Sequence, residues 1–250
     1  MRTPTGEVMM QAIRALLQFT TILPLGKTAP FDSFAHNTWL YPLAGYVIGG
    51  FGACVFLFPG PSMVQAVIAM GVIVLVTGAN HFDGLLDLGD GLMAHGSQER
   101  RREALTDRQI GTGAVCLGMI ILFMSIAALS SFHASLTALS ALVLAEVGGK
   151  WCMAVMTVWG RPFHEGIHAF LYEKARKWFV IPATSLLIPA FLLPLPLQAR
   201  FSAACVLVLI PMVMLVVARR LFGGVNGDVT GASGEITRAA VLAVVAWVCG

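Results

Sequence analysis

The chain has 250 residues, of which 57% are hydrophobic and only 12% are charged. Its mean hydropathy is +0.81, and charged residues have about half the share that soluble domains usually carry. This composition excludes an ordinary soluble domain and indicates an all-α integral membrane protein.

The apolar segments predict a polytopic membrane helix bundle with about seven transmembrane spans, forming one domain of residues 1–250. Residues 7–23 come first, and they are typical of an amphipathic helix lying in the membrane interface and ended by Pro24. The predicted spans cover residues 38–58, 62–80, 113–131, 135–159, 178–196, 201–218 and 239–249. The second span is expected to run straight into the polar residues from His81, and the fifth is rich in proline. The last run spans only if its helix begins near Ile236 or earlier.

Charged residues lie on one side of these predicted spans. With the N-terminus in the cytoplasm, every Lys and Arg falls inside except Arg200 and Lys150, and every acid except Glu146. The positive-inside rule favours this orientation, with the polar chemistry on the cytoplasmic face. The net charge of +3 is small, so we expect the lipid bilayer rather than nucleic acid as a partner. Glycine-lined spans would permit a homo-oligomer.

Three aspartates follow the second predicted span within a short stretch, HFDGLLDLGDG. In a helix, the spacing of Asp83, Asp87 and Asp90 places all three carboxylates on one face, where they repel one another. Mg²⁺ takes such oxygen ligands and commonly shares them with substrate phosphates. The pattern therefore predicts a metal site for phosphoryl or diphosphate chemistry, the alternative being a solvated acidic turn.

The glycines of this stretch and His81 have separate interpretations. The glycines are poor helix formers, and we interpret them as places where a bulky ligand approaches the backbone. These are Gly84, Gly89 and Gly91. His81 would point away from the aspartates on a regular helix, but it could carry a proton if the helix is irregular.

A second acidic motif begins at Asn226. Asp228 and Glu235 are seven residues apart, so a helix presents both on one face, as further carboxylates for a metal or a substrate hydroxyl. The alternative is a glycine-rich loop whose small residues serve helix packing. On the first interpretation the many glycines around them leave room for a large substrate. They are Gly223, Gly224, Gly227, Gly231 and Gly234.

Basic residues occupy the polar connection that leads to the third span. Arg100, Arg101, Arg102 and Arg108 either set the membrane topology and contact lipid headgroups or bind substrate phosphates. The backbone N–H groups of residues 110–113 could serve a phosphate as well.

Two further groups of ionisable residues have simpler interpretations. Glu146 and Lys150 are four residues apart in the fourth span and predict an intramembrane ion pair. His164, Glu165 and His168 predict a polar loop rather than a metal site.

At HFDGLLDLGDGL the sequence resembles the cobalamin synthases, also known as adenosylcobinamide-GDP ribazoletransferases. The family motif there is close to HLDGLxDxxDG, and GGVNGDVTGASGE is similar to the family's GGxTGDxxGAxxE. The opening LLQFTTILPL, the loop with Arg100, Glu103, Asp107 and IGT, and Arg161 with Glu165-Gly166 resemble further family features. The family's Asp-Ser-Arg is here Asp107-Arg108-Gln109, and its TGD threonine is Asn226.

The resemblance implies the last assembly step of coenzyme B12. Adenosylcobinamide-GDP and α-ribazole, or its 5′-phosphate, are joined and GMP is released, with Mg²⁺ as cofactor, in the bacterial cytoplasmic (inner) membrane. It implies metal ligands Asp83, Asp87, Asp90 and Asp228, and catalytic roles for Asp83, Asp87 and His81. The implied substrate-binding residues are Arg100, Asp107, Arg108, Gly111, Thr112, Asn226 and Glu235.

Three alternatives are weighed at this point. An aspartate-rich prenyltransferase expects two DDxxD-like motifs, but no two aspartates are adjacent in this sequence. A phosphotransferase of the CDP-alcohol type also uses paired acidic motifs on membrane helices, but it expects an Ala-Arg pair that is missing at the matching distance from Asp83-Gly84. A transporter expects ionisable residues near the middle of the membrane, where only Glu146 and Lys150 qualify.

Overall fold

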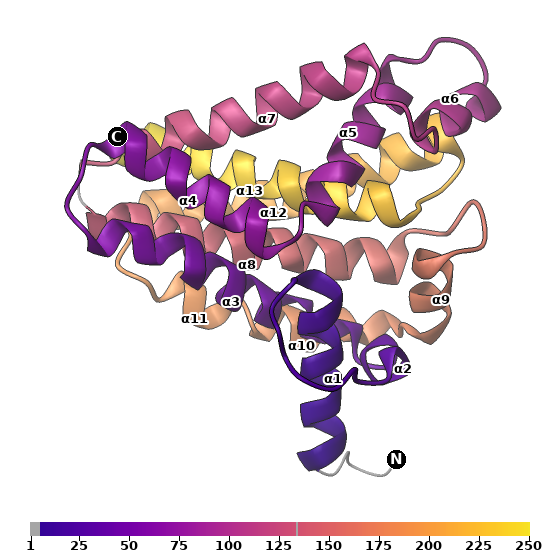
Figure 1. Cartoon of the computed structure of the whole chain (residues 1–250), viewed down its shortest axis with the longest axis horizontal. Helices are drawn as coiled ribbons and strands as arrows, with labels where there is room; N and C mark the ends of the chain where they lie inside the picture. The colour runs from indigo at the N-terminus through magenta and orange to yellow at the C-terminus, as the bar shows by residue number, and fades with distance from the viewer. Residues whose placement is uncertain (1–5, 134) are drawn as a thin grey trace.

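The computed structural model describes residues 6–133 and 135–250. This part of the chain forms helices joined by loops, with no strand and one isolated backbone bridge between Pro162 and Val225. Figure 1 shows the longer helices side by side. The predicted all-α class is confirmed. Among the described residues, five helical segments are long and apolar enough to cross a membrane. They are Thr38–Leu57, which contains α3 (Tyr41–Ala53), α7 (Thr112–Ser130), α8 (Ser135–Trp159), Leu197–Phe222, which contains α12 (Leu197–Val217), and α13 (Gly227–Cys249).

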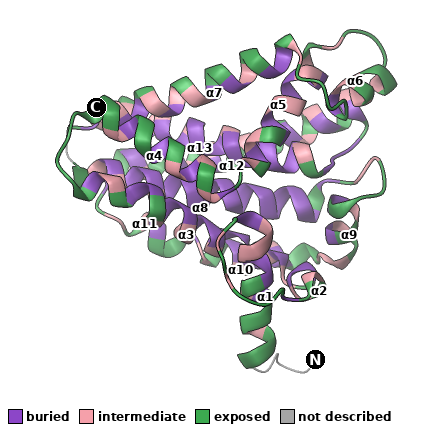
Figure 2. Cartoon of the chain, in the orientation of Figure 1, coloured by how far each residue is buried: buried purple, intermediate pink, exposed green. Residues whose placement is uncertain are grey.

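Helix α8 forms the centre of the bundle and is buried along nearly its whole length (Figure 2). Small residues let its neighbours approach: Gly45 of α3 packs against the backbone at Val147, and Gly149 packs against Gly234 of α13. Large apolar side chains such as Phe123 are instead exposed along the outer faces of α7 and α12. A buried centre with an apolar outer surface is the arrangement expected in a bilayer.

The expected second span is bent. Helix α4 (Ser62–Val76) ends before the aspartates, and α5 (Asn80–Met93) leaves it at an angle of 96°. The turn is a Schellman motif, in which Ala79 N–H donates to Val74 O and Gly78 N–H donates to Leu75 O. Gly78 has φ +60°, which favours glycine, and Ala79 also has a positive φ. The prediction that the span runs straight into His81 is therefore wrong.

The expected fifth span is also wrong in its length. Residues 178–196 lie largely in a shorter apolar helix, Lys177–Phe191, which contains α10 (Val180–Ser185) and α11 (Ile188–Phe191) with a turn between them. Prolines remove backbone donors here, and the Tyr46 hydroxyl replaces one lost helical bond by accepting from Ala190 N–H and donating to Leu186 O. The count over the described residues is thus five candidate spans, or six if α4 and α5 form one, rather than seven. The last predicted span does form, because α13 begins well before Ile236.

The polar connections gather at one end of the bundle. Figure 1 shows α6 (Gln98–Leu105), the loop before α9 (Ile167–Lys174) and the loop before α13 at this end, opposite the C-terminus. The N-terminal helix α1 (Gly6–Thr20) crosses the direction of the long helices and is followed by the short α2 (Phe31–Ala35). Residues that are distant in the sequence therefore meet at one polar end.

Candidate functional site

The polar end contains a cavity of about 480 Å³ that brings the two acidic motifs together. Its walls come from α5, the loop after α6, the start of α7, the loop before α9 and the start of α13. Five carboxylates line it, namely Asp83, Asp87, Asp90, Asp107 and Asp228, and they face one guanidinium, that of Arg108. Such an excess of negative charge is suited to a divalent cation or to groups that bring positive charge with them.

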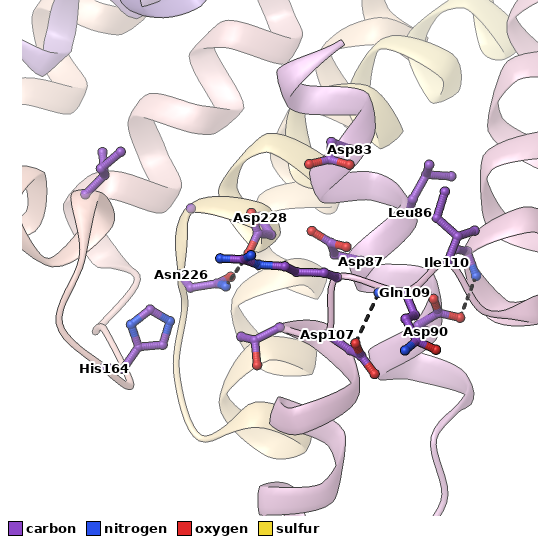
Figure 3. Close-up of a pocket in the computed structure, with 15 residues that line it drawn as sticks. Asp83, Leu86, Asp87, Asp90, Asp107, Gln109, Ile110, His164, Asn226 and Asp228 are labelled. Atoms are coloured by element: carbon purple, nitrogen blue, oxygen red, sulfur yellow. Dashed lines mark hydrogen bonds between the residues drawn. The ribbon is translucent and has the colours of Figure 1, made fainter.

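Asp83 and Asp87 lie one turn apart on α5 and point into the space that faces Asp228 of α13 (Figure 3). The helices can meet this closely because Gly84 lies between the two aspartates. A Cβ placed on Gly84 would be 2.8 Å from both the Cα and the carbonyl oxygen of Asp228. The backbone of one acidic motif therefore touches the backbone of the other.

Asp90 also lies on α5 and lines the cavity, but its carboxylate has a different environment from those of Asp83 and Asp87. Its Oδ2 accepts the Gly111 N–H at 2.7 Å and its Oδ1 accepts the Ala114 N–H at 2.9 Å. Asp90 thus satisfies N–H groups at the start of α7, as an N-cap residue does within its own helix. The predicted phosphate-binding N–H group of Gly111 is therefore hydrogen-bonded to this carboxylate. Thr112 lines a separate, neighbouring pocket.

Asn226 orients the second acidic motif. Its Oδ1 accepts the Val229 N–H at 3.0 Å, which caps α13, and its Nδ2 donates to Asp228 Oδ2 at 2.7 Å. The buried Asn226 thereby fixes the direction of the Asp228 carboxylate. The one glycine of this motif that opens onto the cavity is Gly227, whose Cβ position has no atom within 4 Å.

The structure does not bring Glu235 to this cavity. Glu235 lies two turns further along α13, where it is buried and forms an ion pair with Arg238. Arg238 also bonds Glu146 Oε1 at 3.2 Å, so it lies between two carboxylates in the interior. The predicted Glu146–Lys150 pair is replaced by this arrangement, because Arg238 reaches Glu146 from another helix. Lys150 Nζ instead lies 3.3 Å from His81 Nδ1.

His81 is buried beside a second cavity of about 340 Å³ and is not part of the acidic wall. An ammonium group can only donate, so Lys150 donates to Nδ1 of the His81 ring. The two cavities share Ile167, Gly227 and Asp228. His81 therefore lines the second cavity, which meets the acidic cavity at Asp228.

The basic residues divide into two groups. Arg101 donates to the carbonyls of Gly91 and Leu92, and Arg102 donates to Phe222 O while its guanidinium lies over the Phe163 ring. These two arginines hold the loop and the end of α5. Arg100 is exposed and does not line the acidic cavity, whereas Arg108 does.

The glycines of α5 do not have the ligand-binding role that the sequence predicts. Gly89 lies against the backbone of Gly113, and Gly91 lies against Leu105 and Phe222. They serve contacts between helices, as Gly84 does, rather than the approach of a ligand. In the second motif, Gly234 packs against Met153 in the same way.

Several residues that line the cavity were missed from the sequence. These are Thr106, Gln109 and Ile167, together with His164, which the sequence places in a polar loop. Gln109 N–H donates to Asp107 Oδ1 at 3.1 Å, which fixes part of this loop. A loop without helical periodicity offers no pattern from which such a position could be inferred.

Comparisons with known proteins identify the family of this chain. The family model for cobalamin-5-phosphate synthase matches residues 12–246. The chain belongs to the cobalamin-5-phosphate synthase family. It is 34% identical to the adenosylcobinamide-GDP ribazoletransferase of Halorubrum lacusprofundi over 96% of this chain and 99% of that protein. It is 33% identical to the ribazoletransferase of Methanococcoides burtonii, over 93% of this chain and 90% of that one.

The suspected family resemblance is thus confirmed over almost the whole chain, and the comparisons do not favour a CDP-alcohol phosphotransferase or a transporter. No solved structure matches the chain. The two walls of the cavity carry the HFDGLLDLGDG and GGVNGDVTGASGE motifs, both of which lie within the residues that the family model matches.

Proposed function

We propose that this chain joins adenosylcobinamide-GDP to α-ribazole, or to its 5′-phosphate, and releases GMP in the acidic cavity. One observation carries the proposal. Asp83 and Asp87 of the first motif line the same cavity as Asp228 of the second, and Gly84 holds their backbones in contact. The family's relatives with this name match nearly the full length of the chain.

The reaction exchanges a phosphoanhydride bond for a phosphate ester bond. The ribazole 3′-hydroxyl attacks the phosphorus nearer the cobinamide, the bridging bond of the diphosphate breaks, and GMP leaves with the electron pair. The proton of the hydroxyl passes to a carboxylate that acts as general base. Asp83, Asp87 and Asp228 have side chains available for this work, whereas both Asp90 oxygens accept backbone hydrogen bonds.

The donors around this cavity fit Mg²⁺ as cofactor. No three His, Cys, Asp or Glu side chains in the described part of the chain converge on one point as a complete metal site. Mg²⁺ does not need such a cage, because it usually binds through one or two carboxylates together with water and substrate phosphates. Asp83 and Asp87 would hold the ion, which neutralises charge on the diphosphate and on the departing phosphate. Arg108 would bind a phosphate oxygen.

The membrane orientation is also part of the proposal. The cavity lies at the end of the bundle that carries α6 and the loop before α9, where most of the basic residues are. The positive-inside rule puts this end in the cytoplasm, where both soluble substrates would reach it. Helix α1 crosses the long helices, which supports a position in the membrane interface (Figure 1).

The test is GMP release by the purified full chain from adenosylcobinamide-GDP. We expect GMP only when both α-ribazole and Mg²⁺ are present, and EDTA should stop it. The Asp83→Asn variant should insert normally and lose turnover. Release of GMP at the wild-type rate by Asp83→Asn would contradict the assignment of the site, and no release by the wild type under any of these conditions would contradict the function.

A further inference from the structure

The cavity beside His81 has no role in the site described so far. It encloses about 340 Å³ and adjoins the acidic cavity at Ile167, Gly227 and Asp228. Its other walls come from α9 and α13, the end of α1, the start of α3, the start of α5 and the last turns of α8. A ligand in this cavity would therefore lie next to whatever occupies the acidic one, with Asp228 between them.

Aromatic rings form one wall of this second cavity. Phe19 and Tyr41 line it, and both belong to a cluster of rings behind the wall. The Phe19 and Phe34 ring centroids are 5.8 Å apart, and those of Phe34 and Tyr41 are 4.9 Å apart in an edge-to-face arrangement. Rings that are held by other rings offer a rigid surface to a flat aromatic ligand.

The polar groups of the second cavity are mostly uncharged. His168 Nε2 lies 2.8 Å from Gly160 O, so this nitrogen carries the proton, and Nδ1 lies 3.0 Å from Thr230 Oγ1. Burial lowers the pKa of His168, which keeps the ring neutral. None of the residues that line the cavity is Lys or Arg, in contrast to Arg108 in the acidic cavity. A diphosphate would find no cationic side chain here.

We propose that this second cavity binds the nucleoside substrate, with its aromatic base against Phe19 and Tyr41 and its ribose toward Gly227 and Asp228. The inference rests on the proposed function and adds the place of the second substrate. A volume of this size is at the lower end of ligand pockets, so it suits a nucleoside and excludes a corrin ring. The cobinamide diphosphate then occupies the acidic cavity with Arg108 and the free aspartates.

This placement assigns the general base. Asp228 is the carboxylate that both cavities share, and Asn226 fixes its orientation through the 2.7 Å hydrogen bond. The nucleoside hydroxyl gives its proton to Asp228 as its oxygen forms the new bond to phosphorus. The bond between that phosphorus and the bridging oxygen breaks, and GMP leaves with the pair of electrons. Asp83 and Asp87 are then free to serve the diphosphate and Mg²⁺.

The test measures the binding of α-ribazole to the full chain in detergent by equilibrium dialysis. Two variants change this cavity alone: Phe19→Leu removes a ring, and Asn80→Ala removes an exposed amide from the wall. We expect each to raise the Kd for α-ribazole about fivefold or more, with the KM for adenosylcobinamide-GDP within about twofold of the wild type. Phe123→Leu makes the same change on the outer face of α7 and should alter neither value.

The outcomes separate this inference from the function itself. Normal α-ribazole binding by both variants, or an equal loss of affinity for both substrates, would overturn the place assigned to the nucleoside while wild-type GMP release still supports the function. If the Phe19→Leu chain does not fold, Asn80→Ala decides, because its side chain is exposed. A wild-type chain that releases no GMP would overturn the function instead.

Discussion

Asp90 Oδ2 accepts the backbone N–H of Gly111 at 2.7 Å, which joins the third aspartate of the first motif to the start of α7. Its Oδ1 accepts the Ala114 N–H as well. The three aspartates of one helix face therefore have two tasks. Asp83 and Asp87 face Asp228 across the cavity, and Asp90 positions the loop that carries Asp107 and Arg108.

The first prediction separates these tasks. Asp87→Asn should lower turnover by at least about two orders of magnitude, because it removes a carboxylate that would hold Mg²⁺ against the diphosphate. Asp90→Asn should instead destabilise the chain by about 1–3 kcal/mol, because its amide N–H₂ would face a backbone donor. Thermal unfolding and a Mg²⁺ titration of GMP release measure the two effects. A large rise in the Mg²⁺ requirement of Asp90→Asn, without loss of stability, would show that Asp90 is a metal ligand after all.

Much of this arrangement could be predicted from the sequence. Hydropathy indicated a membrane helix bundle, and the spacing of Asp83 and Asp87 placed them on one helix face, as the structure has them. The bend after Val76 could not be predicted, nor could the separate role of Asp90 in accepting N–H groups of α7. The bend depends on a single local turn with two positive φ angles, and the role of Asp90 depends on N–H groups at the start of α7, which the pattern of α5 does not show.

The position of Glu235 could not be predicted from the sequence either. Its spacing from Asp228 is correct for one face of α13, but a helix face extends over several turns and can pass from a cavity into the interior. The partner that decides its role, Arg238, is one turn away, and Glu146 reaches it from α8. A sequence pattern gives the face of a helix but not what lies opposite each turn.

The second prediction follows from this buried group of charges. Glu235→Ala should destabilise the chain by about 3–5 kcal/mol, because it removes one of the two carboxylates that neutralise a buried guanidinium. The KM values of the remaining folded protein should change little, since Glu235 does not line the acidic cavity. Arg100→Ala, at an exposed residue outside the cavity, is the control and should leave stability and turnover near the wild type. A rise in KM of Glu235→Ala at normal stability would return Glu235 to the substrate site.

The third prediction concerns the boundary between the cavities. Gly227 lines both, and its Cβ position has no atom within 4 Å, so a leucine side chain would enter the shared space without strain in the backbone. We expect Gly227→Leu to fold normally and to lose turnover by about tenfold or more, because the two substrates can no longer meet. Gly71→Leu, at an equally open glycine of α4 away from both cavities, should keep its activity. Equal turnover of the two variants would show that the reaction does not occur at this boundary.

The last prediction tests the contact that holds the site together. Gly84→Ala would place a methyl group 2.8 Å from the Cα and carbonyl oxygen of Asp228, and backbone atoms cannot yield as a flexible side chain does. Helices α5 and α13 must then separate, and a displacement of about 1 Å can cost about two orders of magnitude in rate. We expect this loss in GMP release while the chain still inserts and binds α-ribazole, which lies on the other side of Asp228. Gly71→Ala adds the same methyl group where it meets nothing and serves as the control. Wild-type turnover by Gly84→Ala would mean that the two acidic motifs need not touch, and so that the cavity between them is not where the diphosphate reacts.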